Sequence, residues 1–405
     1  MKIFVQIASY RDPQLIHTLR SLLDNATNPS NLKICIAHQY SDLDDFCNDI
    51  NVYRNDDRFI IMDIPYENSL GCCWARNLIQ QKYTDEKYTL QLDSHHRFVK
   101  GWDDLLISML TSLQDDGFEK PLITTYLPSY NPSDESKVNE TWWMQFDRFI
   151  PEGPVFFSPA SFISDKPISS RFYSGHFAFT LGEFCNEVQH DPELYFHGEE
   201  ITIAVRAYTH GYDLFHPHKI VAWHEYTRNG RVKHWDDDDM WWTKNTKSHY
   251  RTKAILGIDG ICSCTVDVKK YGLGSKRSLE SYEAYAGIRF KDRKVQKYTL
   301  DNKFAPNPKI DDFEDYNNSF LNKFKHCIDL NRNELKDNYT FIAFIFEDVE
   351  SKSLYRKDIP LEELKKQKGE FLNIWCEFFY DTKPYKYIIY PYSNEGWVNK
   401  QEIIL

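Results

Sequence analysis

The 405-residue sequence has no uninterrupted apolar stretch long enough to cross a bilayer as a helix, which takes about 20 residues. It has no excess of positive charge either, since its net charge is −11. Internal repeats and low-complexity tracts are also absent. These absences exclude a helical membrane protein and a repeat protein. They also argue against nucleic acid as a partner, because nonspecific binding to phosphates needs clustered positive charge.

A cysteine framework is missing as well. The nine cysteines are an odd number without regular spacing, and Cys262 and Cys264 are too close in sequence for the usual zinc knuckle. We therefore expect reduced thiols. No signal peptide is recognisable, because residues 2–5 run directly into a strand pattern. Together these features predict a cytoplasmic protein.

The composition is that of a soluble globular protein, with 41% hydrophobic and 27% charged residues. Apolar patterning predicts strands at residues 2–10, 33–38, 58–64, 88–93 and 122–126, with helices between them, including 71–82 and 102–113. Asp12 before Pro13 has the pattern of a helix N-cap. Alternating strands and helices predict an α/β nucleotide-binding fold with parallel strand pairing.

Residues 305–308 (Ala-Pro-Asn-Pro) are typical of a linker, and the patterning differs after them. We predict a helix at 315–329, followed by strands at 339–346, 369–380 and 385–391. The predicted domains are therefore an α/β domain at 1–305 and a small β-rich domain, with a sandwich as one arrangement, at 306–405. For the second domain we expect an accessory or docking role.

Asp93 and His95 end the strand at 88–93 and are the most informative pair in the sequence. In an extended chain residues i and i+2 project to the same side. Ligands of open α/β sheets collect at the carboxyl ends of strands, where this pair stands. A divalent-cation site is therefore one interpretation, and a solvated loop is the other.

His224 ends another strand-like run, 219–223, and is a candidate third ligand, although a structural histidine is the commoner outcome at such a position. Three protein ligands leave coordination positions for a diphosphate. Imidazole ligands favour Mn²⁺ over Mg²⁺, which remains the alternative ion.

Glu199 and Glu200 follow Gly198 at the start of a predicted amphipathic helix, 201–210. Acidic residues in a first turn complement the helix dipole, and this structural explanation is favoured for Glu200. For Glu199, which directly follows a glycine, we favour contact with a sugar or an acceptor. Both are retained as candidate catalytic residues.

Positive side chains follow His224 in a polar segment that contains Gly230: Arg228, Arg231 and Lys233. Such a loop can close over a nucleotide sugar and present charge to its phosphates, or it can be an ordinary surface loop. The segment 171–177 has the pattern of a strand with a glycine, so Ser174, Gly175 and His176 either contact a ligand or belong to a bulged core strand.

In this order, the motifs Asp93-Ser94-His95, Tyr195 to Glu200 and Trp223-His224-Glu225 resemble the GT-A glycosyltransferases. More narrowly, the chain resembles the hydroxyproline polypeptide N-acetylglucosaminyltransferase family and its relatives, the polypeptide GalNAc-transferases. The resemblance covers residues 1 to about 300. The segment 196–199 (Phe-His-Gly-Glu) matches the family's Trp-Gly-x-Glu element with departures at Phe196 and His197.

The resemblance implies roles for further residues. Asp93, His95 and His224 would hold Mn²⁺ with the donor's diphosphate beside Ser94, and Arg76, in the segment 69–77, would lie near the nucleotide. The uridine would sit at the end of the first strand, and the stretch after residue 173 would face the donor sugar. The corresponding residues are Ala8, Ser9, Tyr10 and Arg11, and Ser174, Gly175 and His176. Transfer would retain the anomeric configuration.

Three functions remain open at this stage. The first is a metal-dependent glycosyltransferase that moves a sugar, foremost GlcNAc from UDP-GlcNAc, to a hydroxyl on a protein or glycan. The second is a metal-dependent hydrolase of nucleotide sugars or phosphoesters, and the third is a noncatalytic carbohydrate-binding protein. The sequence does not identify the acceptor or the oligomeric state. Nor do residues alone exclude inversion, in which Glu199 would act as the base.

Overall fold

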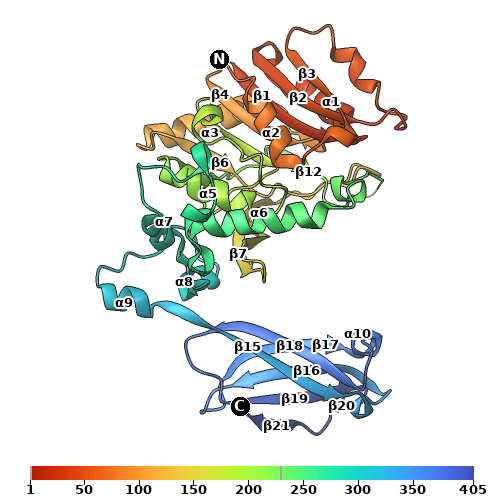
Figure 1. Ribbon diagram of the computed structural model, residues 1–405, viewed down its shortest axis with the longest axis vertical. Coiled ribbons are helices and arrows are strands. Elements are labelled where there is room, and N and C mark those ends of the chain that lie inside the picture. The colour runs from red at the N-terminus through yellow and green to blue at the C-terminus, as the bar shows by residue number, and fades with distance from the viewer. Residues whose placement is uncertain (1, 229) are drawn as a thin grey trace. The chain divides into compact units, whose positions relative to one another are not determined.

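A computed structural model describes residues 2–228 and 230–405, which fall into two compact units (Figure 1). The first unit comprises the chain up to residue 293 together with 298–310. The second comprises 294–297 and 311–405.

The first unit is built on an eight-stranded mixed sheet of order β3-β2-β1-β4-β10-β6-β11-β9. Its strands are β1 (Ile3–Tyr10), β2 (Leu32–Tyr40), β3 (Phe59–Pro65), β4 (Tyr88–Asp93), β6 (Pro121–Thr124), β9 (Ile168–Ser169), β10 (Phe177–Leu181) and β11 (Asp213–His216). The first four strands pair in parallel, as predicted, whereas β10 runs antiparallel to both β4 and β6. This mixed α/β sheet confirms the predicted fold class.

Helices cover both faces of the sheet (Figure 1). α1 (Leu15–Asn25) and α3 (Trp102–Asp115) bury apolar residues on one face, against Ile3, Val5 and Ile7 of β1. α2 (Cys72–Gln80) packs on the other, against Phe4. The side chains of β1 alternate between two cores, which is why its sequence is mostly apolar.

The remaining elements of the first unit lie between or after these strands in the sequence. They are β5 (His96–Phe98), β7 (Thr141–Phe149), β8 (Val155–Phe162), α4 (Phe184–Glu187), α5 (Glu199–Thr209), β12 (Ala222–His224), α6 (Trp241–Leu256), α7 (Leu279–Ala286) and β13 (Ile288–Arg289). α8 (Lys297–Leu300) follows at the end of this unit. β12 pairs with β5 antiparallel, so that His224 lies opposite His96.

Three sequence predictions about secondary structure are wrong. The first α-helix begins at Leu15 with Gln14 as its cap, so Asp12 is not its N-cap. The segment 171–176 is irregular and β10 begins only at Phe177. The predicted helix 315–329 is a short helix, α9 (Phe313–Asn318), followed by the strand β15 (Phe320–Asn331). In β15, ten residue pairs with β18 outweigh a local helical pattern.

The second unit is β-rich. One sheet pairs β14 (Lys294–Gln296) with β15 and β15 with β18 (Phe371–Tyr380). The other has the order β17-β16-β19-β20, with β21 (Gln401–Ile404) on β19. Its strands are β16 (Tyr339–Glu347), β17 (Ser353–Pro360), β19 (Lys386–Ser393) and β20 (Gly396–Trp397), and α10 (Leu361–Lys366) follows β17. Buried side chains of both sheets and α10 form one core, including Ile328, Phe344 and Leu364.

Cys262 and Cys264 are joined as a disulfide, so the expectation of reduced thiols fails at this pair. The other seven cysteines are free. No helix within residues 2–228 and 230–405 is both long and apolar enough to cross a membrane.

Candidate active site

The candidate site lies at the carboxyl ends of β1 and β4, where a pocket is lined from several elements. Its walls include Ala8, Tyr10, Asp12, Asp93, Ser94, His95, Tyr195, Phe196, His224, Tyr226, Arg228, Arg231, Lys233 and Trp235. Strand ends of a parallel sheet meet at one edge, so residues far apart in sequence converge there.

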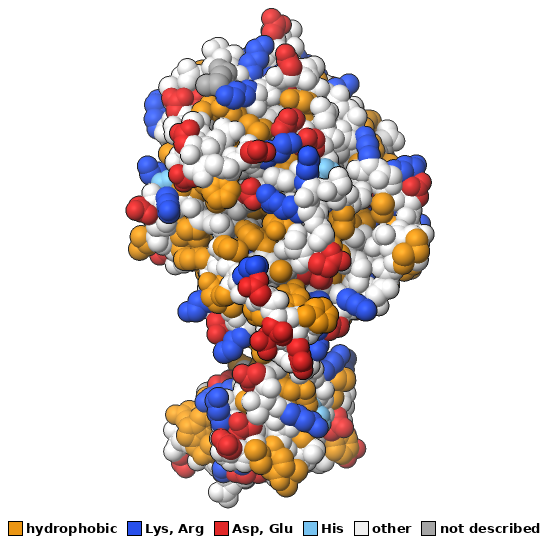
Figure 2. All heavy atoms as spheres, turned by 90° about the vertical axis from the view of Figure 1, so that its left-hand side faces the viewer, with side chains coloured by type: hydrophobic (Ala, Val, Ile, Leu, Met, Phe, Trp, Pro, Cys, Tyr) orange, Lys and Arg blue, Asp and Glu red, His pale blue; other side chains and the backbone are white. Residues whose placement is uncertain are grey.

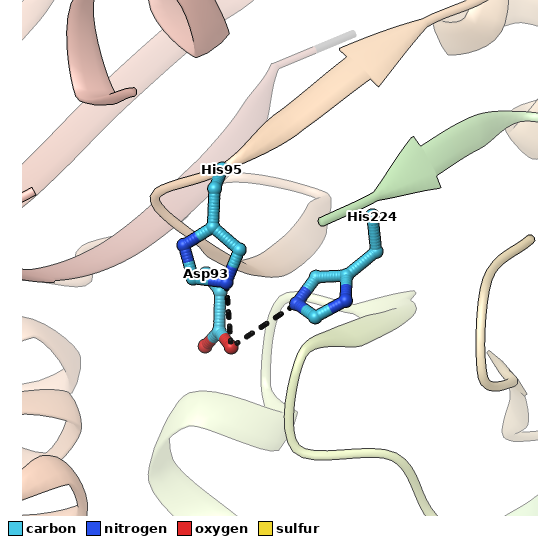
Figure 3. A group of neighbouring side chains, drawn as sticks. All are labelled: Asp93, His95 and His224. Carbon is cyan, nitrogen blue, oxygen red and sulfur yellow. Dashed lines mark ion pairs between the residues drawn. The ribbon is translucent and has the colours of Figure 1, made fainter. Parts of the chain in front are cut away.

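Asp93, His95 and His224 point toward one another at the base of this pocket (Figure 3). Asp93 Oδ2 is 3.8 Å from His95 Nε2 and 3.6 Å from His224 Nε2. Within the described part of the chain, this is the one group of three such residues whose ligand atoms lie within 4.8 Å of one another. The structure therefore brings the three predicted ligands together.

The donor set fits a divalent cation. Burial lowers the pKa of His224 well below its ordinary value, so its imidazole is neutral, which is the ligating form. Both ring nitrogens of His224 are buried without a hydrogen-bond partner among the described residues. A carboxylate with two imidazoles is a set that suits Mn²⁺.

Asp12 orients one of the ligands. Its Oδ2 accepts from His95 Nδ1 at 2.7 Å and from the Ser94 hydroxyl at 2.6 Å. Burial alone would raise the pKa of Asp12, but the charge and hydrogen bond of His95, with Arg231, hold it below its usual range. When Nδ1–H donates a hydrogen bond to a carboxylate, the proton stays on Nδ1 and the lone pair of Nε2 is available to a metal. Sequence analysis missed this role, although an acidic residue just after the first strand was its signal.

His176 lies behind the third ligand and does not line the pocket. Its ring stacks on that of His224 with centroids 4.1 Å apart, and its Nε2 accepts from Leu127 N at 3.1 Å. Burial lowers the pKa of His176 to about 3, so it is neutral. His176 therefore supports His224 from within the core.

Arg76 is also buried, at 3% exposure, behind the metal ligands. Its Nη2 is 2.9 Å from Asp93 Oδ1, and its Nη1 is 3.6 Å from Glu199 Oε1. The guanidinium thus connects the candidate metal site to the start of α5. It does not line the main pocket, where a contact with the nucleotide was predicted.

Glu199 and Glu200 occupy the first turn of α5, as predicted, and line a second pocket with Tyr126, Phe156, Phe157, Phe196, His197 and Arg228. Glu200 accepts from Gly175 N at 2.8 Å and from the Tyr126 hydroxyl at 2.7 Å. Burial, then the charge of Glu200, raises the pKa of Glu199 to about 8. Burial raises the pKa of Glu200 as well.

Ser174 and Gly175 hold this turn rather than line either pocket. Ser174 N donates to Thr124 Oγ1 at 2.9 Å, and Gly175 O accepts from Gln91 Nε2 at 2.6 Å. A Cβ on Gly175 would lie 3.0 Å from Glu199 Oε1, so this glycine allows the close approach of the two segments.

The four predicted residues at the end of β1 divide between two sides. Ala8 and Tyr10 line the main pocket, whereas Ser9 and Arg11 face away from it. Strand alternation separates them. Arg11 pairs instead with Asp44 and Asp237 at 2.8 and 2.9 Å.

The loop after β12 supplies the positive charge of the main pocket. Arg228, Arg231 and Lys233 all line it, while residue 229 lies outside the described chain. Arg231 Nη1 is 3.2 Å from Asp12 Oδ2 and 3.0 Å from His95 Nε2, and its Nη2 is 3.0 Å from Glu225 Oε2. The loop arginine therefore lies directly beside a candidate metal ligand.

Aromatic side chains, among them Phe196 of the 196–199 element, complete the pocket wall. The Arg228 guanidinium lies over the rings of Phe196 and Trp235, at 5.9 and 5.3 Å from their centroids. Tyr195 and His234 share a hydrogen bond of 2.7 Å. Their signal in the sequence was the aromatic content around 195–196 and 234–235, which a core would show equally well.

Comparison with known proteins identifies the family to which the chain belongs. The family model described as Glycosyltransferase (GlcNAc) matches residues 2–61 and 48–292. A search of curated proteins found no match.

Among solved structures, the fold resembles that of GalNAc-T7, solved with UDP, GalNAc and Mn²⁺, with a TM-score of 0.51 and 15% identity over 63% of this chain. The matched part spans 48% of the GalNAc-T7 chain. TarS of S. aureus, solved with UDP-GlcNAc as residues 1–349, has a TM-score of 0.38 and 13% identity over 59% of this chain and 61% of that one. The family match covers most of the sequence and every residue of the site described above, so the chain belongs to the glycosyltransferase (GlcNAc) family and has a GT-A fold related to that of the GalNAc-transferases.

Proposed function

We propose that this glycosyltransferase moves a sugar from a UDP-sugar, foremost GlcNAc from UDP-GlcNAc, to a hydroxyl of a protein or glycan acceptor. The observation that carries the proposal is the convergence of Asp93, His95 and His224 beneath a pocket rich in positive side chains. The name of the matched family favours GlcNAc as the transferred sugar.

Mn²⁺ is the proposed cation, held by Asp93, His95 and His224. When bound, it supplies positive charge to a diphosphate leaving group. Arg228, Arg231 and Lys233 line the same pocket and would neutralise the charge that builds on the phosphates as the glycosidic bond breaks. Ala8 and Tyr10 line the wall at the end of β1, where we place the nucleoside.

Glu199 and Glu200 face the second pocket, which shares Phe196 and Arg228 with the first, and we place the acceptor there. Burial raises the pKa of Glu199 to about 8, so this carboxyl can donate a hydrogen bond near neutral pH. The proposal that transfer retains configuration follows from the family resemblance.

We further propose that residues 1–305 form the catalytic domain and 306–405 an accessory domain. The separate cores of the two units support this division. The cytoplasmic location stays a prediction.

The test is UDP release from a panel of UDP-sugars with Mn²⁺, with EDTA, and with the Asp93→Ala variant. We expect one donor to be turned over, and chelation or the substitution to lower the rate by at least about 100-fold, because the diphosphate loses its counter-charge. Asp44→Ala, which removes a carboxylate bound to Arg11 outside the pocket, is the matched control and should retain activity.

The products distinguish the remaining possibilities. UDP release that never depends on an acceptor would identify a hydrolase and contradict the proposal. With an acceptor found, a β-anomeric signal in the proton NMR spectrum of the product would contradict retention. Turnover that survives both EDTA and Asp93→Ala would remove the metal assignment.

A further inference from the structure

The two outer faces of the second unit differ in kind. In a β-sandwich the residues that alternate with the core are normally polar. The outer face of β15 and β18 mixes polar and aromatic positions, since it pairs Lys325 with Glu377, Cys327 with Trp375, Asp329 with Asn373 and Asn331 with Phe371. Phe371 and Trp375 are 52% and 55% exposed and lie four residues apart on β18. Figure 2 shows hydrophobic side chains among charged ones on the surface of this unit.

The outer face of the other sheet carries a group of aromatic rings instead. Phe341 of β16 lies opposite Tyr392 of β19, and Tyr390 lies opposite the small Ala343. Trp397 of β20 lies opposite Tyr392. We refer to Phe341, Tyr390, Tyr392 and Trp397 as the aromatic platform.

Trp397 is the centre of the aromatic platform. Its ring centroid is 4.3 Å from that of Tyr390, 5.1 Å from Tyr392 and 5.6 Å from Phe341. The guanidinium of Arg356, on the far strand β17, is 5.2 Å from the same ring. The indole therefore extends from β20 across the sheet as far as β17. It nevertheless remains 42% exposed, so part of the ring is open to solvent.

A fixed pair of charges borders the platform. Arg356 donates from Nε to Asp358 Oδ1 and from Nη2 to Oδ2, each at 2.8 Å, and both side chains are more than 40% exposed. Among the described residues, Arg356 Nη1 and the hydroxyls of Tyr390 and Tyr392 make no hydrogen bond. Hydrogen-bond donors and acceptors therefore surround an exposed ring.

The size of the platform decides between possible occupants. Strands spaced by about 4.8 Å and residues rising by about 3.4 Å make it roughly 200 Å² in area. A stable protein interface needs about 800 Å² from each partner and excludes charged residues from its centre. A surface this small suits a short ligand with an apolar face and polar edges, which is the chemistry of a sugar ring. Because Arg356 and Asp358 neutralise each other, that sugar should be uncharged.

We propose that the aromatic platform around Trp397 is a binding site for neutral oligosaccharides, separate from the catalytic pocket. The sugar stacks on the indole, and its hydroxyls bond to Arg356, Asp358 and the tyrosine hydroxyls. The inference rests on the second unit alone and does not require the proposed transfer reaction.

Affinity electrophoresis of the full chain in native gels tests the site. The gels contain hydroxyethyl cellulose, glycogen, mannan or galactan as neutral probes, and heparin as a charged one. All proteins carry Asp93→Ala, so that the candidate catalytic site is disabled in every lane. We expect one neutral polysaccharide to retard the chain, and Trp397→Ala to weaken that binding by about tenfold. Trp375→Ala, on the opposite face, should bind as the parent does.

Two further measurements keep the result interpretable. Trp397→Phe, with a smaller ring, should restore part of the binding, and the thermal unfolding of each variant shows that the second unit is folded. The proposal is overturned if no neutral polysaccharide retards the chain, if heparin alone does, or if Trp375→Ala loses as much binding as Trp397→Ala. It is also overturned if the parent is an oligomer that Trp397→Ala converts to a monomer, because the occupant is then a second copy of the chain.

Discussion

Individual carboxylates at the candidate site differ in what they contact, and Asp12 has the most telling contacts. It binds no pocket ligand in the proposal, yet it holds His95 by Nδ1 and Ser94 by its hydroxyl. A buried acceptor of this kind fixes the tautomer of a metal-binding imidazole. Asp12 is therefore a positioning residue.

The Asp12→Asn variant measures that role. An amide oxygen carries no charge and is a weaker acceptor for Nδ1–H of His95. We therefore expect the affinity for Mn²⁺ to fall by about 10- to 100-fold. Electron paramagnetic resonance of free Mn²⁺ during titration of the apoprotein gives this affinity without any assay of turnover. Asp44→Asn, at a carboxylate bound to Arg11, should leave it unchanged. Equal affinities for both variants would contradict the positioning role.

The sequence predicted the candidate metal ligands better than the residues that hold them in position. Asp93, His95 and His224 were predictable because strand ends and the two-residue period of a strand place them at one edge. Asp12 was assigned to a helix cap, and Arg76 to the nucleotide, because side-chain contacts across 219 or 17 residues leave no local pattern. Aromatic residues such as Trp235 have the same composition signal in a core and in a binding wall.

At the level of elements, the start of α5 is closely constrained by its backbone and by a neighbouring helix. Gly198 precedes Glu199 with φ of +101°, and a Cβ there would lie 2.2 Å from Thr252 Oγ1 on α6. Both the left-handed backbone and the close helix contact require glycine. This explains how two glutamates reach the second pocket.

A comparison of Gly198→Ala with Gly117→Ala separates the cost of the backbone conformation from the cost of the close contact. Gly117 has φ of +98° and open space around it, so Gly117→Ala should cost only about 1–2 kcal/mol for the backbone conformation. We expect Gly198→Ala to lower the free energy of unfolding by about 1–3 kcal/mol more, from overpacking against Thr252. Urea unfolding measures both. Thr252→Ala in the same chain should recover part of the loss, and no recovery would contradict the contact.

Elements with strong local patterns were predictable and those set by distant pairing were not. The four parallel strands β1 to β4 are rich in apolar residues, which gave them a recognisable local pattern. The segment 171–176 has strand-like residues, but its backbone turns at Ser174, where an isolated bridge to Phe177 closes it. In β15, Phe324 and Ile328 recur at a helical spacing, yet they pair with Phe378 and Ile374 of β18.

For the whole molecule, the two units have separate cores. Phe344 is fully buried among residues of the second unit, and Leu90 among those of the first. Each core has its own buried apolar area, which is the main source of folding free energy. The chain should therefore unfold in two steps.

Calorimetry of Phe344→Ala checks this. The substitution should cost about 3–5 kcal/mol and lower the temperature of one transition only. UDP release measured below both transitions should be unchanged. Leu90→Ala, at about 2–5 kcal/mol, should lower the other transition. A single transition that both variants shift equally would show that the units fold as one.

The contacts of Asp12 connect the candidate metal site to the loop after β12. One carboxylate touches both a candidate metal ligand, His95, and the loop arginine Arg231. Two equilibria that draw on the same group are linked, and thermodynamics requires the linkage to be reciprocal. By whatever factor the ion changes the population of loop conformations, the loop changes the affinity for the ion by that same factor. The affinity for the cation and the population of loop conformations should therefore both report the same coupling free energy.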